Sequence, residues 1–153
     1  MGVREYSEKD LKQLAKLYKS YFKTHTLFEQ TEDKVIIHLR EQVKKNPCLV
    51  FEEEEEIRGA LFLVSKNVDG AHKLWKLRHF AFTKSYIGEQ LLKEAEDKAK
   101  ENSKTAKIEM SIAESEDGIN FLKAQGYEQE GCLKNHYRWQ ERCYILSKSF
   151  KNE

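Results

Sequence analysis

The sequence predicts an α/β protein, with one mixed sheet in a single domain that covers residues 1–153. Two β-rich runs, residues 48–51 and 57–64, flank a block of glutamates, as the strands of a hairpin flank a solvated turn. In the second half of the chain, strand-like and helix-like patterns alternate, which is typical of an α/β sheet. The predicted strands are residues 48–51, 57–64, 74–82, 106–113, 131–137 and 144–150.

Apolar residues at helical spacing predict the helices. Ser7 and Asp10 have the spacing of a capping box, so the N-terminal residues are expected to lead directly into the first helix. Thr31 opens the second helix, which ends before Pro47 because the residue before a proline is disfavoured in a helix. The third helix begins at Tyr86, and a short fourth helix follows the next strand. The expected buried faces are Leu11, Leu14, Ala15, Tyr18 and Phe22, then Val35, Ile36, Leu39 and Val43, then Ile87, Leu91, Leu92, Ala95 and Ala99.

Several turns are expected between these elements. The acidic run at residues 52–56 predicts a solvated hairpin tip; a cation site is the alternative, disfavoured because like charges in a block rarely converge on a ligand. Gly59, inside the second strand, predicts a bulge or a close approach of two backbones. An Asp-Gly dipeptide favours another hairpin turn within residues 65–73, and residues 24–30 are expected to be a loop.

Composition excludes several classes of protein. Hydrophobic residues make up 39% of the 153 residues, too many for a disordered chain and enough for a buried core. The 27 basic and 26 acidic residues give a net charge of +1, so no overall field favours nucleic acid or an anionic membrane. No apolar run approaches the ~20 residues that span a bilayer, and the N-terminus lacks the apolar stretch of a signal peptide. A cytoplasmic protein is expected, with Cys48, Cys132 and Cys143 as reduced, buried thiols.

The order and the endings of these elements resemble the GNAT N-acetyltransferase superfamily over nearly the whole chain. The resemblance rests on the strand at residues 74–82, on the helix opened by Tyr86-Ile87-Gly88, on Gly126-Tyr127 after the fourth helix, and on the closing run at residues 141–148. It implies an α/β (α+β) fold: a mixed, mostly antiparallel GNAT-like sheet with splayed central parallel strands, flanked by helices.

The resemblance also implies a function. GNAT enzymes transfer an acetyl group from acetyl-coenzyme A, their co-substrate, directly to an amine of a small molecule, a protein N-terminus or a lysine. An N-acetyltransferase is therefore expected. A binding or regulatory module of the same fold, with weak or lost catalysis, is the alternative, because several motif residues differ.

Pyrophosphate binding needs backbone N–H groups that converge at a helix N-terminus. GNAT proteins typically carry there an Arg or Gln, two residues, Gly, one residue, then Gly or Ala; residues 83–88 match that stretch. Gly88 is in register, whereas Thr83 stands at the basic position and Tyr86 at the first glycine. Lys84 and Ser85 offer a substitute cation and hydroxyl, and a turn that merely ends the strand is the alternative. The coenzyme contacts implied are Phe80, Ala81, Phe82, Lys84, Tyr86, Ile87, Gly88, Glu89, Gln90 and Ser115.

Acetyl transfer needs a base for the ammonium and, later, a protonated or stabilised thiolate. Glu109 resembles the strand glutamate that ribosomal-protein N-terminal acetyltransferases use as base, although a sheet glutamate that faces solvent or pairs with a lysine would look the same. The family's helix tyrosine is Leu122 here, so Tyr137 is the substitute candidate acid. His79 is a second candidate base that can titrate near neutral pH, unless its role is structural. Ser115 falls where the family often has an Asn on the pantetheine arm, and capping of the following helix explains it equally well.

The expected partners follow from the same patterns. Tyr21, His25 and Phe28 fall outside the tight apolar stripe of the first helix and loop, so they are candidates to shape an acceptor cleft. No His or Cys pair has the spacing of a zinc site, and no basic aromatic patch points to nucleic acid, so neither a metal nor a nucleic acid is expected. An amine acceptor is expected, and a homodimer is kept open because the exposed edge of a GNAT sheet often pairs.

Overall fold

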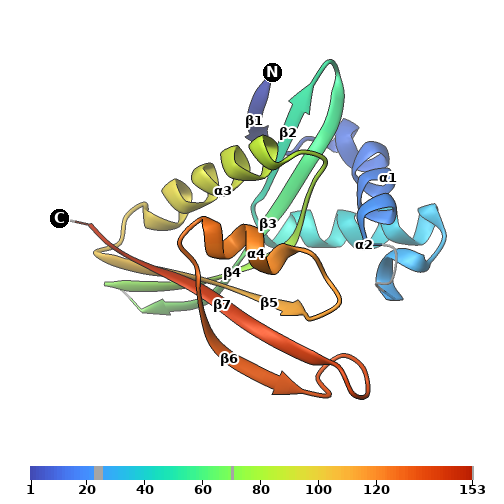
Figure 1. Ribbon diagram of the computed structural model, residues 1–153. Helices are drawn as coiled ribbons and strands as arrows, with labels where there is room; N and C mark the ends of the chain where they lie inside the picture. Colours follow the sequence, from blue (N-terminus) through green and yellow to red (C-terminus); the bar gives the residue numbers. More distant parts are fainter. Residues whose placement is uncertain (23–25, 70, 153) are drawn as a thin grey trace. The chain divides into compact units, whose positions relative to one another are not determined.

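The computed structural model describes residues 1–22, 26–69 and 71–152 of the chain (Figure 1). In this part of the chain, seven strands form one sheet in the order β1-β2-β3-β4-β5-β7-β6. The elements are β1 (Gly2–Glu5), η1 (Glu8–Asp10), α1 (Leu11–Tyr21), η2 (Thr26–Glu29), α2 (Glu32–Lys45), β2 (Cys48–Glu53), β3 (Glu56–Asp69), β4 (His72–Phe82), α3 (Ser85–Lys100), β5 (Thr105–Ala113), α4 (Gly118–Ala124), β6 (Glu128–Lys134) and β7 (Arg142–Lys151).

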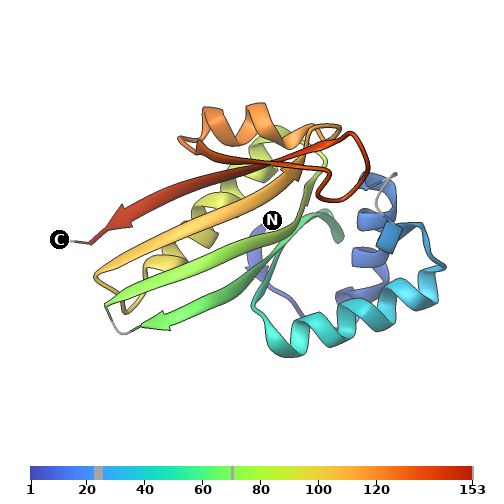
Figure 2. The same ribbon diagram turned by 90° about the horizontal axis from the view of Figure 1, so that it is seen from below.

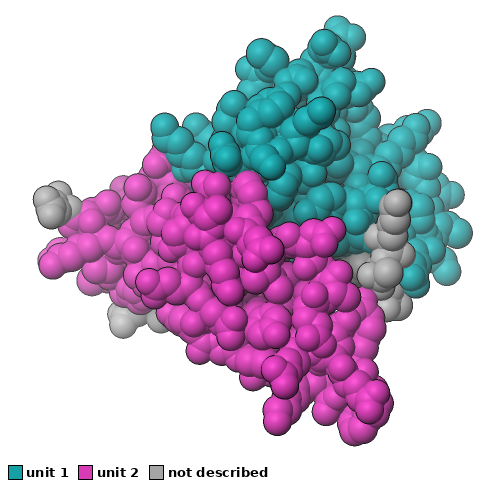
Figure 3. Space-filling model, in the orientation of Figure 1, with its two compact units in different colours: residues 1–64, 78–95 teal, residues 65–77, 96–153 magenta. Residues whose placement is uncertain are grey.

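The chain divides into two compact units, coloured separately in Figure 3. Unit 1 comprises residues 1–64 and 78–95, and unit 2 comprises residues 65–77 and 96–153. Three elements, β3, β4 and α3, contribute residues to both units. The expected single domain stays a prediction.

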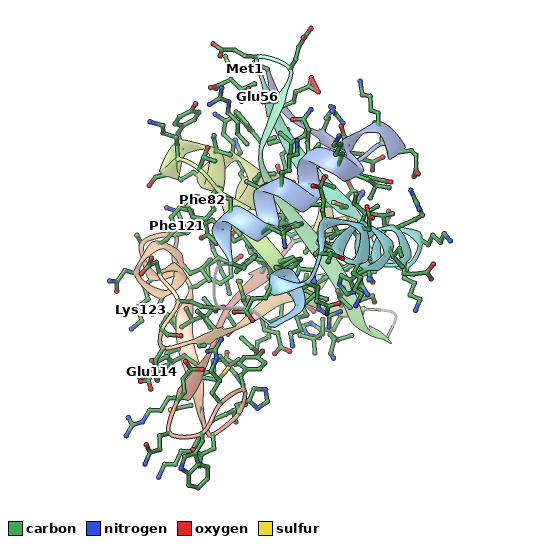
Figure 4. The ribbon with its side chains drawn as sticks, turned by 90° about the vertical axis from the view of Figure 1, so that its right-hand side faces the viewer. Met1, Glu56, Phe82, Glu114, Phe121 and Lys123 are labelled. Atoms are coloured by element: carbon green, nitrogen blue, oxygen red, sulfur yellow. The ribbon has the colours of Figure 1, made fainter. Side chains whose placement is uncertain are left out.

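In unit 1, β1 pairs antiparallel with β2, and β2 pairs antiparallel with β3. The register of Gly2 with Glu52 places the N-terminus beside the tip of the β2–β3 hairpin, and Figure 4 labels Met1 and Glu56 at this end. The expectation that the N-terminus leads directly into a helix is wrong, because Gly2–Glu5 is a strand. Four residues are too few to show alternation, and the partner strand lies far along the chain.

Helices cover both faces of the strands in unit 1. α1 and α2 bury their predicted apolar faces in one cluster with residues of β2 and β3. α3 packs on the opposite face at Gly59, where an added Cβ would lie 2.6 Å from Ile87 Cγ2 and 2.7 Å from Leu91 Cδ1. The register also slips here, from Phe51↔Gly59 to Glu52↔Ile57. The added Cβ would also lie 3.2 Å from the backbone carbonyl of Ala81, so the predicted close approach of two backbones is confirmed, and the predicted bulge lies at the next residue, Arg58.

In unit 2, β5, β7 and β6 form an antiparallel arrangement, and the first residues of β4 pair in parallel with β5 (Figure 2). The parallel register runs from His72↔Thr105 to Lys76↔Glu109, and both strands continue beyond it. α4 packs against β7 and ends as predicted: Gly126 has φ +92°, and the Tyr127 amide donates to the Leu122 carbonyl at 3.0 Å. The mixed, mostly antiparallel sheet with a central parallel pair is therefore confirmed.

Two local features complete the fold. Cys48 and Cys143 are buried, but Cys132 is exposed on β6, so the expectation that all three thiols are buried is wrong for this residue. In the described sheet β6 is the edge strand after β7, and nearly all of its residues are exposed, Cys132 among them. In the described residues, no helix is both long and apolar enough to cross a membrane.

Candidate active site

The turn between β4 and α3, expected to hold the pyrophosphate, lies in unit 1. The Lys84 carbonyl accepts hydrogen bonds from the amides of Ile87 (3.0 Å) and Gly88 (3.2 Å), and both of these residues are buried. Two of the amides expected to bind phosphate are thus engaged within the first turn of the helix. The exposed residues here are Thr83, Lys84, Ser85, Tyr86, Glu89 and Gln90.

Tyr86, at the position of the first glycine, is held against the β2–β3 hairpin. Its hydroxyl donates to Glu53 Oε2 at 2.7 Å, and its ring meets Phe51 edge-on, with 6.1 Å between the ring centroids. The hydrogen bond to Glu53 raises the pKa of Tyr86 above its usual value. The bulky side chain at this position is therefore fixed by contacts with β2.

Arg58, the residue that the bulge leaves unpaired, lies among the glutamates of the same hairpin. Its Nη2 is 3.4 Å from Glu54 Oε2 and 3.3 Å from Glu56 Oε2, and its Nε is 3.9 Å from Glu53 Oε1. Glu54 is 81% exposed, so the predicted solvated tip is confirmed. The sequence analysis did not predict that Arg58 binds these glutamates. Its position two residues after the acidic run could have indicated such an ion pair.

His79 is on β4 and is half-buried in an aromatic cluster of unit 1. Its ring centroid lies 5.1 Å from Phe28, 5.8 Å from Tyr18 and 5.8 Å from Phe62. Its Nε2 is 3.5 Å from Nε2 of His38 on α2. His38 was missed as well, although it flanks the apolar stripe of its helix.

The other residues of unit 1 that were predicted to contact the coenzyme or the acceptor differ in how exposed they are. Phe80 and Ala81 are buried, while Phe82, labelled in Figure 4, is half-buried with its ring 6.0 Å from Tyr21. Tyr21 is exposed, as an acceptor cleft would need, but Phe28 is only 1% exposed and packs in the core. His25, the third residue proposed for the cleft, lies outside the described residues.

Glu109 is half-buried on β5, in unit 2. Its register partners are Lys76 on β4 and Ser147 on β7. Ile108, the next residue, is fully buried, so the predicted alternation is confirmed at this point of the strand. Lys76, on the neighbouring strand, could pair with Glu109 whether this carboxylate is structural or catalytic. The role of Glu109 therefore stays a prediction.

The loop between β6 and β7 is joined to the end of β5. Ser115 donates its hydroxyl to Glu141 Oε2 at 2.8 Å, and Arg138 Nη1 binds both Glu141 oxygens at 2.7 and 2.8 Å. The Ser115 hydroxyl therefore holds this loop, and α4 begins only at Gly118. Figure 4 labels Glu114, which precedes the connection, and Phe121 and Lys123 of α4.

Tyr137, the candidate acid, lies in this loop and is 55% exposed. Burial raises the pKa of the Cys143 thiol, and a hydrogen bond with Tyr137 opposes that shift. Trp139 is 80% exposed in the same loop. Burial also raises the pKa of Glu116, the residue after Ser115, and its Oε2 accepts from the Ala113 amide at 3.2 Å.

Comparisons with known proteins identify the family. A family described as the acetyltransferase (GNAT) domain matches residues 3–144. The chain belongs to this family. It is an acetyltransferase that takes its acetyl group from acetyl-coenzyme A and acts on an amine acceptor.

Solved structures with the same fold have low sequence identity. An aminoglycoside 6'-N-acetyltransferase from Enterococcus faecium is 15% identical, with a TM-score of 0.76, over 100% of this chain and 99% of that one. An aminoglycoside 6'-N-acetyltransferase in complex with coenzyme A is 15% identical, with a TM-score of 0.78 and the same coverage. A ribosomal-protein-alanine N-acetyltransferase from Brucella melitensis is 18% identical, with a TM-score of 0.71, over 98% of this chain and 100% of that one. A search of the curated proteins finds no match.

Proposed function

We propose that the acceptor is a small polycationic molecule carrying a primary amine, with amino sugars of the aminoglycoside class as the first candidates. The proposal is supported mainly by the β6–β7 loop, where the aromatic side chains of Tyr137 and Trp139 are exposed. Aromatic faces attract cations. The fold shared with two aminoglycoside acetyltransferases over essentially their whole length is consistent with this acceptor class.

The reaction proposed is direct transfer. The acceptor ammonium loses a proton to a base, its nitrogen bonds to the thioester carbonyl carbon, the carbon–sulfur bond breaks, and the thiolate of coenzyme A leaves. Glu109 and His79 are the proposed candidates for the base, and Tyr137 is the proposed acid for the leaving thiolate. Phe80–Phe82, Lys84–Gln90 and Ser115 are proposed to contact the coenzyme.

Release of free coenzyme A thiol tests this proposal. The protein is mixed with acetyl-coenzyme A and, in separate reactions, with an aminoglycoside, with spermidine and with a peptide that begins with alanine. We expect the fastest release with the aminoglycoside. Faster release with the peptide would assign a protein N-terminus as acceptor and contradict the proposal.

A calorimetric titration with acetyl-coenzyme A accompanies this assay. If the protein binds acetyl-coenzyme A but releases no thiol with any amine, it is a binding module of the GNAT fold. Trp139→Ala should lower kcat/KM for the amine while leaving the affinity for acetyl-coenzyme A unchanged. An unaltered kcat/KM in this variant would remove the β6–β7 loop from acceptor binding.

A further inference from the structure

The β6–β7 loop, residues 135–141, is closed at its base by hydrogen bonds of its own. The Asn135 amide donates to the Glu141 carbonyl at 3.0 Å, which extends the pairing of the two strands into the loop. The Gln140 amide donates to Asn135 Oδ1 at 2.7 Å. Asn135 and Gln140 both have a left-handed backbone, with φ of +52° and +62°. The residues between them, 136–139, therefore form a tip whose two ends are fixed.

The carboxylate of Glu141 ties this base to the segment that follows β5. Its side chain is only 14% exposed, and Arg138 Nη1 binds its two oxygens at 2.7 and 2.8 Å. Ser115, 26 residues earlier in the chain, donates its hydroxyl to Glu141 Oε2 at 2.8 Å. Hydrogen bonds to a charged group are among the strong ones in proteins, so Glu141 is well suited to hold the loop. We call Glu141, Arg138 and Ser115 the Glu141 clamp.

A second acidic residue binds the start of β7 from the same segment. The Glu114 amide donates to the Arg142 carbonyl at 2.9 Å, and the Arg142 amide donates to Glu114 Oε1 at 3.0 Å. Glu114 and Ser115 are consecutive, so the end of the loop and the start of the strand are bound at one place. All of these residues belong to unit 2.

The tip that this base supports carries large aromatic side chains that face solvent. Tyr137 is 55% exposed and Trp139 is 80% exposed. The rings of His136 and Tyr137 meet edge-on, with their centroids 4.6 Å apart. Aromatic side chains on a rigid loop bind a ligand at a low cost in conformational entropy, because their positions are fixed before the ligand arrives. A loop that is tied at its base and aromatic at its tip has the features of a preorganised binding loop.

We propose that Glu141 is a positioning residue for the acceptor, an inference that rests on the proposed function. Through Arg138 and Ser115, Glu141 holds the β6–β7 loop in the conformation that presents Tyr137 and Trp139 to the amine. It acts through the loop and not by contact with the ammonium, because both of its oxygens are bound and Arg138 balances its charge. Loss of Glu141 should therefore weaken binding of the amine and leave binding of acetyl-coenzyme A as it is.

Backbone NMR relaxation tests the clamp without any acceptor. In the wild type, the amides of residues 136–139 should have the order parameters of a rigid backbone, about 0.85. In Glu141→Ala they should fall below about 0.6, the range of flexible segments. Glu141→Gln keeps an oxygen for Arg138 and an NH₂ group for the Ser115 hydroxyl oxygen, so its tip should stay close to that of the wild type.

The matched control is Glu128→Ala, which removes an exposed carboxylate from β6 and should leave the tip as rigid as in the wild type. A tip that is already flexible in the wild type would overturn the clamp. A tip that is equally rigid in the wild type and in Glu141→Ala would overturn it as well.

Steady-state kinetics then tests the positioning role, with the amine that gives the fastest thiol release. Glu141→Ala should raise KM for the amine by roughly tenfold, because the loop must be ordered on binding. It should leave kcat and the affinity for acetyl-coenzyme A unchanged, since only binding of the amine is affected. Glu141→Gln should restore most of the loss. Equal losses for the amine and for acetyl-coenzyme A would overturn the positioning role, because a general loss of structure would affect both substrates.

A double-mutant cycle with Trp139 shows whether Glu141 acts through the tip. If it does, Glu141→Ala should cost much less kcat/KM in the Trp139→Ala background than in the wild type, since the side chain that it positions is gone. Fully additive effects would mean that Glu141 binds the amine by itself, and would overturn the proposal. Absence of turnover with every amine would overturn the proposed function and the positioning role with it, whereas a rigid tip in Glu141→Ala overturns only the clamp.

Discussion

At the residue scale, Asp10 is the buried charged residue among those that the structure describes. It is 2% exposed, and Arg4 binds its two oxygens at 2.8 and 2.9 Å while also contacting Glu52 at 2.6 Å. The Ser7 amide donates to the same carboxylate at 2.8 Å. Burial alone would raise the pKa of Asp10, but the hydrogen bonds from Arg4 and Ser7 lower it overall. The carboxylate is therefore a charged anchor between β1 and the start of α1.

Asp10→Asn should lower the free energy of unfolding by about 1–3 kcal/mol at neutral pH, as loss of charge-assisted hydrogen bonds does. A carboxylate whose folded-state pKa is depressed contributes stability above its unfolded-state pKa of about 3.9 and loses it as the pH falls through the folded-state value. The difference between variant and wild type in urea unfolding should thus be constant above about pH 5 and shrink below about pH 4. A difference that grows on acidification would contradict this account of Asp10.

At the element scale, the close contact between β3 and α3 requires a residue without a side chain, Gly59. Gly59→Ala would place a methyl group within 2.6–2.7 Å of Ile87 and Leu91 and 3.2 Å from the Ala81 carbonyl. Overpacking of this kind typically costs about 1–3 kcal/mol, which urea unfolding can measure. Gly118→Ala is the matched control, because its nearest neighbour would be Ile112 Cδ1 at 3.5 Å, an ordinary contact. Equal stability of the two variants would refute the close approach.

The start of α3 allows a test of coenzyme placement. Ser85 is exposed at the first helical position, and a carboxylate there favours the helix but repels phosphates. Ser85→Asp should therefore weaken acetyl-coenzyme A binding by more than tenfold, about 1.4 kcal/mol, without loss of stability. Lys93→Gln changes the net charge equally on an exposed part of the same helix and should bind normally. Unchanged affinity of Ser85→Asp would move the pyrophosphate away from this turn.

The helices show what the sequence could predict. α2 and α3 start within one residue of the expected positions, and α1 starts at Leu11, after a 3-10 turn (Glu8–Asp10) at the expected helix start. The three helices bury Leu14, Leu39 and Leu91 as expected, because helical periodicity is a local signal. The contacts that depend on distant residues were not predictable in this way. His38 and His79 are 41 positions apart, and Tyr86 and Glu53 are 33 apart, so no spacing pattern links them.

At the scale of the whole molecule, the two compact units raise the question of how many domains the chain forms. Because β3, β4 and α3 each contribute to both units, we expect one cooperative unfolding transition. Trp75 and Trp139 belong to unit 2, while α1 and α2 belong to unit 1, so tryptophan fluorescence and far-UV circular dichroism report largely on different units. Coincident urea transitions would support a single domain, and separate midpoints would show two.

The central claim is that the chain moves an acetyl group from acetyl-coenzyme A to an amine. The most direct measurement follows a carbon-13 label from the acetyl group of acetyl-coenzyme A into the products by mass spectrometry, with an aminoglycoside as acceptor. We predict that the label appears on an amine of the acceptor, in step with the free coenzyme A released, and that His79→Gln slows its appearance. Label that stays on the coenzyme bound to a folded protein, with every amine supplied, would contradict the claim.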